Sequence, residues 1–285
     1  MAPVSLVVVT DLDGTLLDHD SYSASAAAGG LELLARHAVP LVFCSSKTRA
    51  EVELVQRQLG VRAPFISENG GALFVPDGYF PFPIDATREL AGWHAVEFGR
   101  AYSEVVSGLH SAATLAGVEV RGFSDMSADE VARECRMPLD RACLAKRREY
   151  DEPFRVRGRS ARCRWRLFRA LGEQGLFWTS GARFEHATGA SDKGVGIRRL
   201  RTMYARAADA PVVILGLGDG LNDVPLLHAV DIPVIVRNSA AGTTDAVRRQ
   251  VPVAHITAAD GPAGWSEAIE DILGEVLGGS PGACH

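Results

Sequence analysis

The chain has 285 residues, of which 47% are hydrophobic, so it is long enough to bury a substantial core and does not resemble a disordered chain. Its net charge of -5 argues against general nucleic-acid binding. Five widely spaced cysteines without a CxxC pair argue against disulfides and structural zinc, and favour a cytoplasmic protein. The N-terminal apolar run is short, so we expect neither a signal peptide nor a membrane span.

The first third of the chain alternates short apolar strands with helices. The expected strands are 6–9, 41–44, 64–66 and 72–75, and the expected helices are 23–38 and 48–59. Thr48 and Glu51 form a capping-box pattern at the second helix, and Asn69-Gly70 predicts a tight turn. This order favours a parallel sheet with right-handed crossovers.

A different pattern follows the Pro- and Gly-rich stretch 76–83. We expect residues 85–183 to form an inserted α+β cap domain, close to the common domain size. Its expected helices are 99–116, 128–135, 139–148 and 161–174, and its expected strands are 118–123, 154–156 and 176–179.

The first pattern resumes near Lys193. The expected helices are 193–208, a segment ending near 230, 240–250 and 263–277, with strands at 212–215, 232–236 and near Val253. The tail 278–285 has no pattern and is expected to be disordered. Residues 1–84 and 184–285 are therefore predicted to form one α/β core, a doubly wound, Rossmann-like parallel sheet.

Polar groups follow four of the expected strands. They are Asp11 to Thr15, Ser45 to Lys47, Glu68 to Gly71, and Gly218 to Asp223. The carboxyl ends of parallel strands share one edge of a sheet, so these groups are expected to meet there. Several carboxylates at one place repel each other unless a cation lies among them. Oxygen ligands without His or Cys favour Mg²⁺.

This set of residue types suits phosphoryl transfer. One aspartate of the pair Asp11 and Asp13 can attack phosphorus, and the other can protonate the leaving oxygen and later activate water. The Ser45 hydroxyl and the Lys193 ammonium can hold the charged phosphoryl oxygens. Gly14 permits close approach of the backbone to the phosphoryl group.

Together these motifs resemble the haloacid-dehalogenase-like phosphohydrolase superfamily. They are Asp11-Leu12-Asp13-Gly14-Thr15, Ser45, Lys193, and Gly218-Asp219-Gly220-Leu221-Asn222-Asp223. The resemblance implies that Asp11 is the nucleophile and Asp13 the general acid/base. It implies Mg²⁺ bound by Asp11, the Asp13 backbone carbonyl and Asp219, with Asp223 and Asn222 close by. An insertion after the third strand implies the large α/β-capped group, the Cof-type or IIB members.

Three further stretches are similar to the mannosyl-3-phosphoglycerate phosphatase family and its near relatives, namely 45–49, 150–154 and 180–186. This implies a cytoplasmic phosphatase of mannosylglycerate biosynthesis, a compatible-solute pathway. Its substrate would carry a phosphate, a carboxylate and a sugar. The candidate substrate contacts are Gly14, Thr15, Ser46, Lys47, Glu68, Asn69, Gly70, Arg183 and Asn222. Arginine can hold a carboxylate through two hydrogen bonds, and Glu68 can accept from sugar hydroxyls.

Purely structural explanations stay open for several of these residues. Glu68 can cap its turn, His186 can bind substrate or be structural, and the arginines of 155–169 can form a solvated helix face instead of steering an anion. The same core also suits a phosphatase for another sugar phosphate, or a sugar phosphomutase. A receiver-type signalling domain and a silent binding protein fit less well. We expect a small phosphorylated sugar as substrate, without nucleic acid or membrane as a partner, and the oligomeric state stays open.

Overall fold

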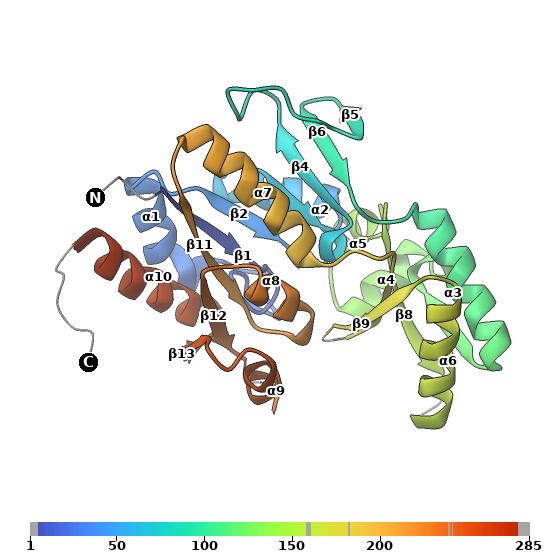
Figure 1. Ribbon diagram of the computed structural model, residues 1–285. Coiled ribbons are helices and arrows are strands. Elements are labelled where there is room, and N and C mark those ends of the chain that lie inside the picture. The colour runs from blue at the N-terminus through green and yellow to red at the C-terminus, as the bar shows by residue number, and fades with distance from the viewer. Residues whose placement is uncertain (1–4, 158–160, 182, 239, 241, 279–285) are drawn as a thin grey trace. The chain divides into compact units, whose positions relative to one another are not determined.

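The computed structural model describes residues 5–157, 161–181, 183–238, 240 and 242–278 (Figure 1). Apart from its first residue, the expected tail 278–285 lies outside this range. The chain divides into two compact units, Met1–Val42 with Ala210–His285, and Phe43–Asp209. Within the described ranges, no helix is both long and apolar enough to cross a membrane.

The first unit is built on four parallel strands. In sheet order they are β13 (His255–Asp260), β12 (Ile232–Arg237), β11 (Val212–Gly218) and β1 (Ser5–Thr10). Its helices are α1 (Ala28–Arg36), α8 (Val224–His228), α9 (Thr243–Gln250) and α10 (Gly261–Gly278). β1 and β11 pair along the whole of β1, ending at Thr10 and Leu217. The loops that follow these two strands therefore begin side by side.

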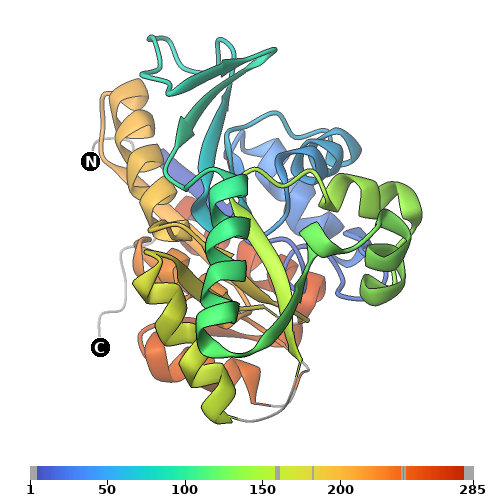
Figure 2. The same cartoon turned by 90° about the vertical axis from the view of Figure 1, so that its right-hand side faces the viewer.

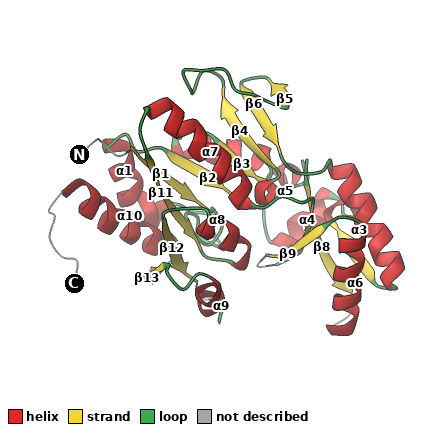
Figure 3. Ribbon diagram, viewed as in Figure 1, coloured by secondary structure: helices red, strands yellow, loops and turns green. Residues whose placement is uncertain are grey.

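Helix α10 anchors the end of β1. Trp265 is fully buried, and its Nε1 donates to Thr10 Oγ1 over 3.0 Å. α1 lies beside α10 in Figure 3, and a Cβ on Gly30 would come 2.9 Å from the Trp265 ring. Glycine at position 30 thus allows the two helices to pack closely around the indole. The result is a rigid strand end immediately before Asp11.

The second unit begins with the two remaining parallel strands and their antiparallel extension. The strands are β2 (Leu41–Cys44), β3 (Phe65–Ser67), β4 (Ala72–Pro76), β6 (Trp93–Glu97) and β5 (Arg88–Leu90), and the helices are α2 (Arg49–Leu59) and α7 (Lys193–Ala208). β2 and β3 are parallel, whereas β4, β6 and β5 pair antiparallel in that order. The Thr48–Glu51 capping box is confirmed, and Gly60 ends α2 with φ +65°.

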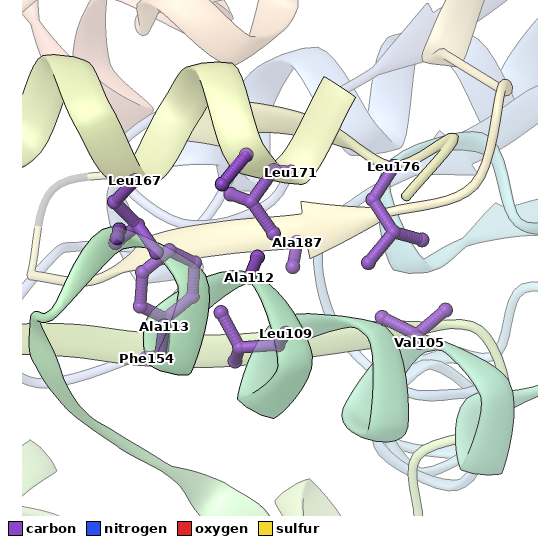
Figure 4. Packing of buried hydrophobic residues seen from close by; sticks show 11 residues of the cluster. Val105, Leu109, Ala112, Ala113, Phe154, Leu167, Leu171, Leu176 and Ala187 are labelled. Carbon is purple, nitrogen blue, oxygen red and sulfur yellow. The ribbon is translucent and has the colours of Figure 1, made fainter. Parts of the chain in front are cut away.

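The rest of the second unit is an antiparallel sheet covered on one face by two helices (Figure 2). Its strand order is β7 (Glu119–Gly122), β8 (Asp151–Arg157), β10 (Glu185–Thr188) and β9 (Phe177–Ser180). The covering helices are α3 (Tyr102–Ala116) and α6 (Ala161–Glu173). Leu109, Phe154 and Leu167 meet in the apolar layer between the sheet and these two helices (Figure 4). The short helices α4 (Ala128–Cys135) and α5 (Leu139–Ala145) enclose a second cluster around Phe123 and Phe184.

The α/β fold class is confirmed, with parallel strands, their helices and a separate antiparallel sheet. Some elements differ from the prediction. β5, β6 and β10 are additional strands, since short, polar runs such as Glu185–Thr188 give weak periodicity. The helix expected at 23–38 is shorter, because a 3-10 turn at Ser25–Ala27 precedes α1. The strand expected near Val253 lies at β13, and Val253 itself is 83% exposed. The cap boundaries 85–183 stay a prediction.

Candidate active site

Three buried carboxylates meet at the carboxyl ends of β1 and β11. Asp11, Asp219 and Asp223 each offer an oxygen within 4.8 Å of the others. Asp11 directly follows β1, and the other two lie in the loop after β11. Like charges at this spacing repel one another in a buried site unless a cation is bound. An all-oxygen donor set fits a hard divalent cation such as Mg²⁺.

Asp219 is held by hydrogen bonds from both sides. Thr15 Oγ1 donates to its Oδ1 over 2.8 Å, and Asn238 Nδ2 donates to its Oδ2. Asn238 was absent from the sequence prediction, although it directly follows β12 at the same edge of the sheet. The signal in the sequence that could have identified Asn238 is its position directly after a strand. These bonds orient the carboxylate and stabilise its charge.

Asp223 holds the loop that carries Asp219. Its Oδ2 accepts from the backbone N–H of Asp219 over 3.1 Å and from that of Gly220 over 2.9 Å. Asn222 is half-buried in the same turn. The turn therefore presents Asp219 and Asp223 on a short, internally bonded loop.

Gly14 lies directly against Asp219. Its φ is +81°, and a Cβ would come 2.8 Å from Asp219 Oδ2. The backbone of this loop is closed by hydrogen bonds from Leu17 N to Leu12 O and from Gly14 N to Leu17 O. Asp13 is half-buried on this loop, two residues after Asp11. Only glycine satisfies both the conformation and the close approach at position 14.

The polar loops after β2 and β3 are joined in the second unit. Glu68 N donates to Lys47 O over 3.0 Å, and Asn69 N donates to Ser45 O over 3.1 Å. Ser45 is buried, and its Oγ accepts from Lys47 N over 3.3 Å. Ser46 is half-buried in the same loop. The predicted neighbourhood of these two loops is thus confirmed within this unit.

Lys193 is buried at the start of α7, which packs against the turn Glu68–Gly70. Gly70 has φ +98°, and a Cβ there would come 2.1 Å from the Asp192 carbonyl oxygen. Glycine therefore lets the first turn of α7 approach the loop after β3. Burial of an ammonium group is costly unless anions face it, so this position is typical of a functional lysine.

Glu68 is engaged by the segment that leads into β8. Its carboxylate accepts from the backbone N–H groups of Glu149, Tyr150 and Asp151 at 2.8 to 3.1 Å, and Arg148 lies 3.5 Å away. Burial raises the pKa of Glu68 to about 7, although Arg148 acts in the opposite direction. These bonds hold the segment 149–151, whereas the turn-capping alternative expected bonds within the turn that carries Glu68. Substrate contact through Glu68 stays a prediction.

Asp151 lies at the centre of a buried polar network. It accepts from Asn69 Nδ2 over 2.7 Å, from Arg148 Nη2 over 2.9 Å, and pairs with His186 Nδ1 at 2.8 Å. Burial alone would raise the pKa of Asp151, but the nearby His186 and Arg148 lower it below its ordinary value. The carboxylate is therefore charged, and it orients the imidazole of His186.

The predicted substrate arginine has a local partner. Arg183 Nη1 donates to the carbonyl oxygen of Cys135 in α4. In the described part of the 155–169 segment, several arginines pair with acids: Arg155 with Glu134, Arg157 with Glu119, Arg164 with Glu185, and Arg169 with Glu173. This charge balance favours the solvated-face interpretation for those arginines.

Comparison with known proteins identifies the class of protein to which this site belongs. Residues 8–79 match the haloacid dehalogenase-like hydrolase family. The chain is 39% identical over 269 residues to the glucosyl-3-phosphoglycerate/mannosyl-3-phosphoglycerate phosphatase of Methanococcoides burtonii, covering 94% of this chain and 97% of the relative. It is 33% identical over 230 residues to the mannosyl-3-phosphoglycerate phosphatase of Pyrococcus horikoshii, covering 81% and 90%.

The fold is shared with solved phosphatase structures. The sucrose-phosphatase of Synechocystis sp. PCC6803 superimposes with a TM-score of 0.62 at 14% identity, covering 94% of this chain and 98% of that one. A sugar phosphatase of HAD subclass IIB gives a TM-score of 0.62 at 15% identity, covering 93% and 98%. The chain therefore belongs to the haloacid dehalogenase-like hydrolase family. The two relatives named above bear the narrower names of glucosyl-3-phosphoglycerate/mannosyl-3-phosphoglycerate phosphatase and mannosyl-3-phosphoglycerate phosphatase.

Proposed function

We propose that the protein is a Mg²⁺-dependent phosphatase that hydrolyses the phosphomonoester of mannosyl-3-phosphoglycerate or a close glycosyl-3-phosphoglycerate. The observation that carries this proposal is the buried cluster of Asp11, Asp219 and Asp223 at adjoining strand ends. The names of the relatives at 33 to 39% identity support the substrate class. A cytoplasmic location and mannosylglycerate biosynthesis stay predictions.

The proposed metal ligands are Asp11, Asp219 and Asp223, with the backbone carbonyl of Asp13. A bound Mg²⁺ neutralises the repulsion between these carboxylates and the phosphate dianion. Thr15 and Asn238 keep Asp219 oriented toward the cluster through their hydrogen bonds. Such bonds around a ligand raise its affinity for the ion.

Asp11 acts as the nucleophile in this proposal. One of its carboxylate oxygens forms a bond to phosphorus while the bond from phosphorus to the ester oxygen breaks. Asp13 transfers its proton to that leaving oxygen. Asp13 then takes a proton from water as the water oxygen attacks the aspartyl-phosphate, which releases inorganic phosphate and restores Asp11.

We assign the remaining predicted residues to the substrate. Ser45 and Lys193 hold the phosphoryl oxygens, since a buried hydroxyl and a buried ammonium group can both donate to them. The proposed contacts to the phosphoryl group and the organic moiety are Gly14, Thr15, Ser46, Lys47, Glu68, Asn69, Gly70, Arg183 and Asn222. The assembly of both units into one site belongs to this proposal.

A substrate panel tests the function. Phosphate release is measured for mannosyl-3-phosphoglycerate, glucosyl-3-phosphoglycerate, sucrose phosphate and simple hexose phosphates, with Mg²⁺ and with EDTA. The proposal predicts the highest kcat/KM for the two glycosyl-3-phosphoglycerates and loss of activity with EDTA. Preference for another sugar phosphate supports the alternative phosphatase. Isomer conversion without phosphate release supports a sugar phosphomutase.

A further inference from the structure

His186 lies on the side of the antiparallel sheet that faces away from α3 and α6. Its neighbours on β10 face α3 and α6, because Ala187 belongs to the apolar cluster with these helices and Glu185 pairs with Arg164 of α6. Side chains alternate along a strand, so the imidazole of His186 points to the opposite face. The relative exposure of His186 is 9%. This placement separates it from the helix-packing residues.

The imidazole is fixed in one orientation. Nδ1 lies 2.8 Å from Asp151 Oδ1, and Asp151 is itself held by Asn69 and Arg148. A carboxylate at Nδ1 keeps a proton on that nitrogen, which leaves Nε2 as the ring's second polar atom. No described residue forms a hydrogen bond with Nε2.

Gly181 borders the Nε2 edge of the ring. A Cβ at position 181 would lie 2.9 Å from Nε2 and 3.2 Å from Cδ2. Its φ lies outside the left-handed region, so the backbone there does not require glycine. The absence of a Cβ at position 181 therefore lets the backbone lie close to the Nε2 edge of the ring. Nδ1 of this buried ring is held by Asp151, whereas Nε2 has no hydrogen-bond partner among the described residues and can therefore bond to a ligand atom.

We infer that Nε2 of His186 forms a hydrogen bond with a hydroxyl of the substrate's sugar, and that Asp151 is its positioning residue. This inference rests on the proposed function. A hydroxyl fits better than a carboxylate, because the cation nearest the ring, Arg148, is already paired with Asp151. A hydroxyl also pairs with Nε2 in either protonation state, since it both donates and accepts.

His186→Asn isolates the contact. The Asn side-chain amide takes the place of Nδ1 and keeps a donor for Asp151, but it has no atom at Nε2. Gly181→Ala tests the same contact from the other side, because its methyl group would cover Nε2 while the ring stays intact. The matched controls are His110→Asn on α3, where the imidazole is 46% exposed, and Gly172→Ala on α6, where a Cβ meets nothing within 4 Å.

Steady-state kinetics with two substrates provide the test. One is the preferred glycosyl-3-phosphoglycerate, and the other is p-nitrophenyl phosphate, which has the ester but no sugar. Both test variants should raise KM for the sugar substrate about 10-fold, the value of a lost hydrogen bond, and leave p-nitrophenyl phosphate hydrolysis unchanged. Both controls should behave as wild type, and the melting temperature establishes that each variant is folded.

Unchanged KM for the sugar substrate in a folded variant overturns the inference, as does an equal loss on both substrates. Failure of the proposed function looks different, since the wild type then hydrolyses another sugar phosphate better than either glycosyl-3-phosphoglycerate. The same KM comparison is then made with that sugar phosphate. A wild type that hydrolyses p-nitrophenyl phosphate but no sugar phosphate overturns both proposals.

Discussion

Thr15 Oγ1 donates a hydrogen bond of 2.8 Å to Asp219 Oδ1, although 204 positions separate the two residues in the chain. The bond joins the loop after β1 to the loop after β11. It thereby links the segment that carries Asp11 and Asp13 to the segment that completes the carboxylate cluster. The alignment of β1 with β11 makes this bond possible, because the two loops leave the sheet at neighbouring positions.

Thr15→Val removes this donor while keeping the side-chain volume. Asp219 then loses one of the bonds that orient it, and we expect the Mg²⁺ concentration for half-maximal activity to rise about 3- to 10-fold. A Mg²⁺ titration of the initial rate measures this. Thr202→Val on α7 is the control, since within the described part of the chain the Thr202 hydroxyl bonds to the Arg198 carbonyl alone. An unchanged titration midpoint in Thr15→Val would show that the bond does not support the metal site.

Gly14→Ala combines two penalties that a second variant can separate. The positive φ costs about 1–3 kcal/mol for alanine, and the new Cβ would press on Asp219 Oδ2. Gly92→Ala has the same conformational cost, with φ +83°, but its Cβ meets nothing within 4 Å. We expect both variants to lose stability from the strained backbone, and Gly14→Ala to lose more because of its added contact. Only Gly14→Ala should lose activity, by about 100-fold, because its new methyl group displaces the carboxylate of Asp219.

Chemical denaturation and phosphate release, measured side by side, test this pair. Equal activity of the two folded variants would contradict the close approach of Gly14 to Asp219. A large loss of activity in Gly92→Ala would show that backbone strain alone accounts for the effect.

The raised pKa of Glu68 predicts that its contribution to the free energy of unfolding depends on pH. Its pKa is about 7 in the folded protein against an ordinary value of 4.5, so the folded state binds the proton more tightly. The stabilisation of wild type relative to Glu68→Gln should therefore fall as pH rises from about 4.5 to about 7. The total change is on the order of 3 kcal/mol. Urea unfolding at several pH values measures it, with the exposed Glu32→Gln as control. A difference between wild type and Glu68→Gln that is independent of pH would refute the raised pKa.

The strand ends of the catalytic core were readable from the sequence. Acidic residues at the end of a buried apolar run, as at Asp11, are energetically costly and therefore indicate a function. The cap residue Thr48 and the terminating Gly60 indicate where α2 begins and ends. These signals are local. They located β1, α2 and α7 to within a few residues.

The remaining parts depend on partners that are distant in the chain. Asn238 bonds to Asp219, and its only signal in the sequence is its place directly after a strand. Arg148 bonds to Asp151 and Glu68, and no local pattern reveals it. The short strand Glu185–Thr188 is held in place by pairing with β8 and β9 more than by its own composition. Its His186 acquires a distinct position only when Asp151 and Gly181 are placed around it.

The central claim is that Asp11 performs nucleophilic catalysis on a glycosyl-3-phosphoglycerate. Asp11→Asn keeps the shape of the side chain but removes the attacking carboxylate, and Asp20→Asn is the exposed control. The measurement is phosphate release from mannosyl- and glucosyl-3-phosphoglycerate at saturating Mg²⁺. The account predicts that Asp11→Asn is folded but at least about 1,000-fold slower than wild type, while Asp20→Asn retains full activity. Release by Asp11→Asn within about tenfold of wild type would contradict it.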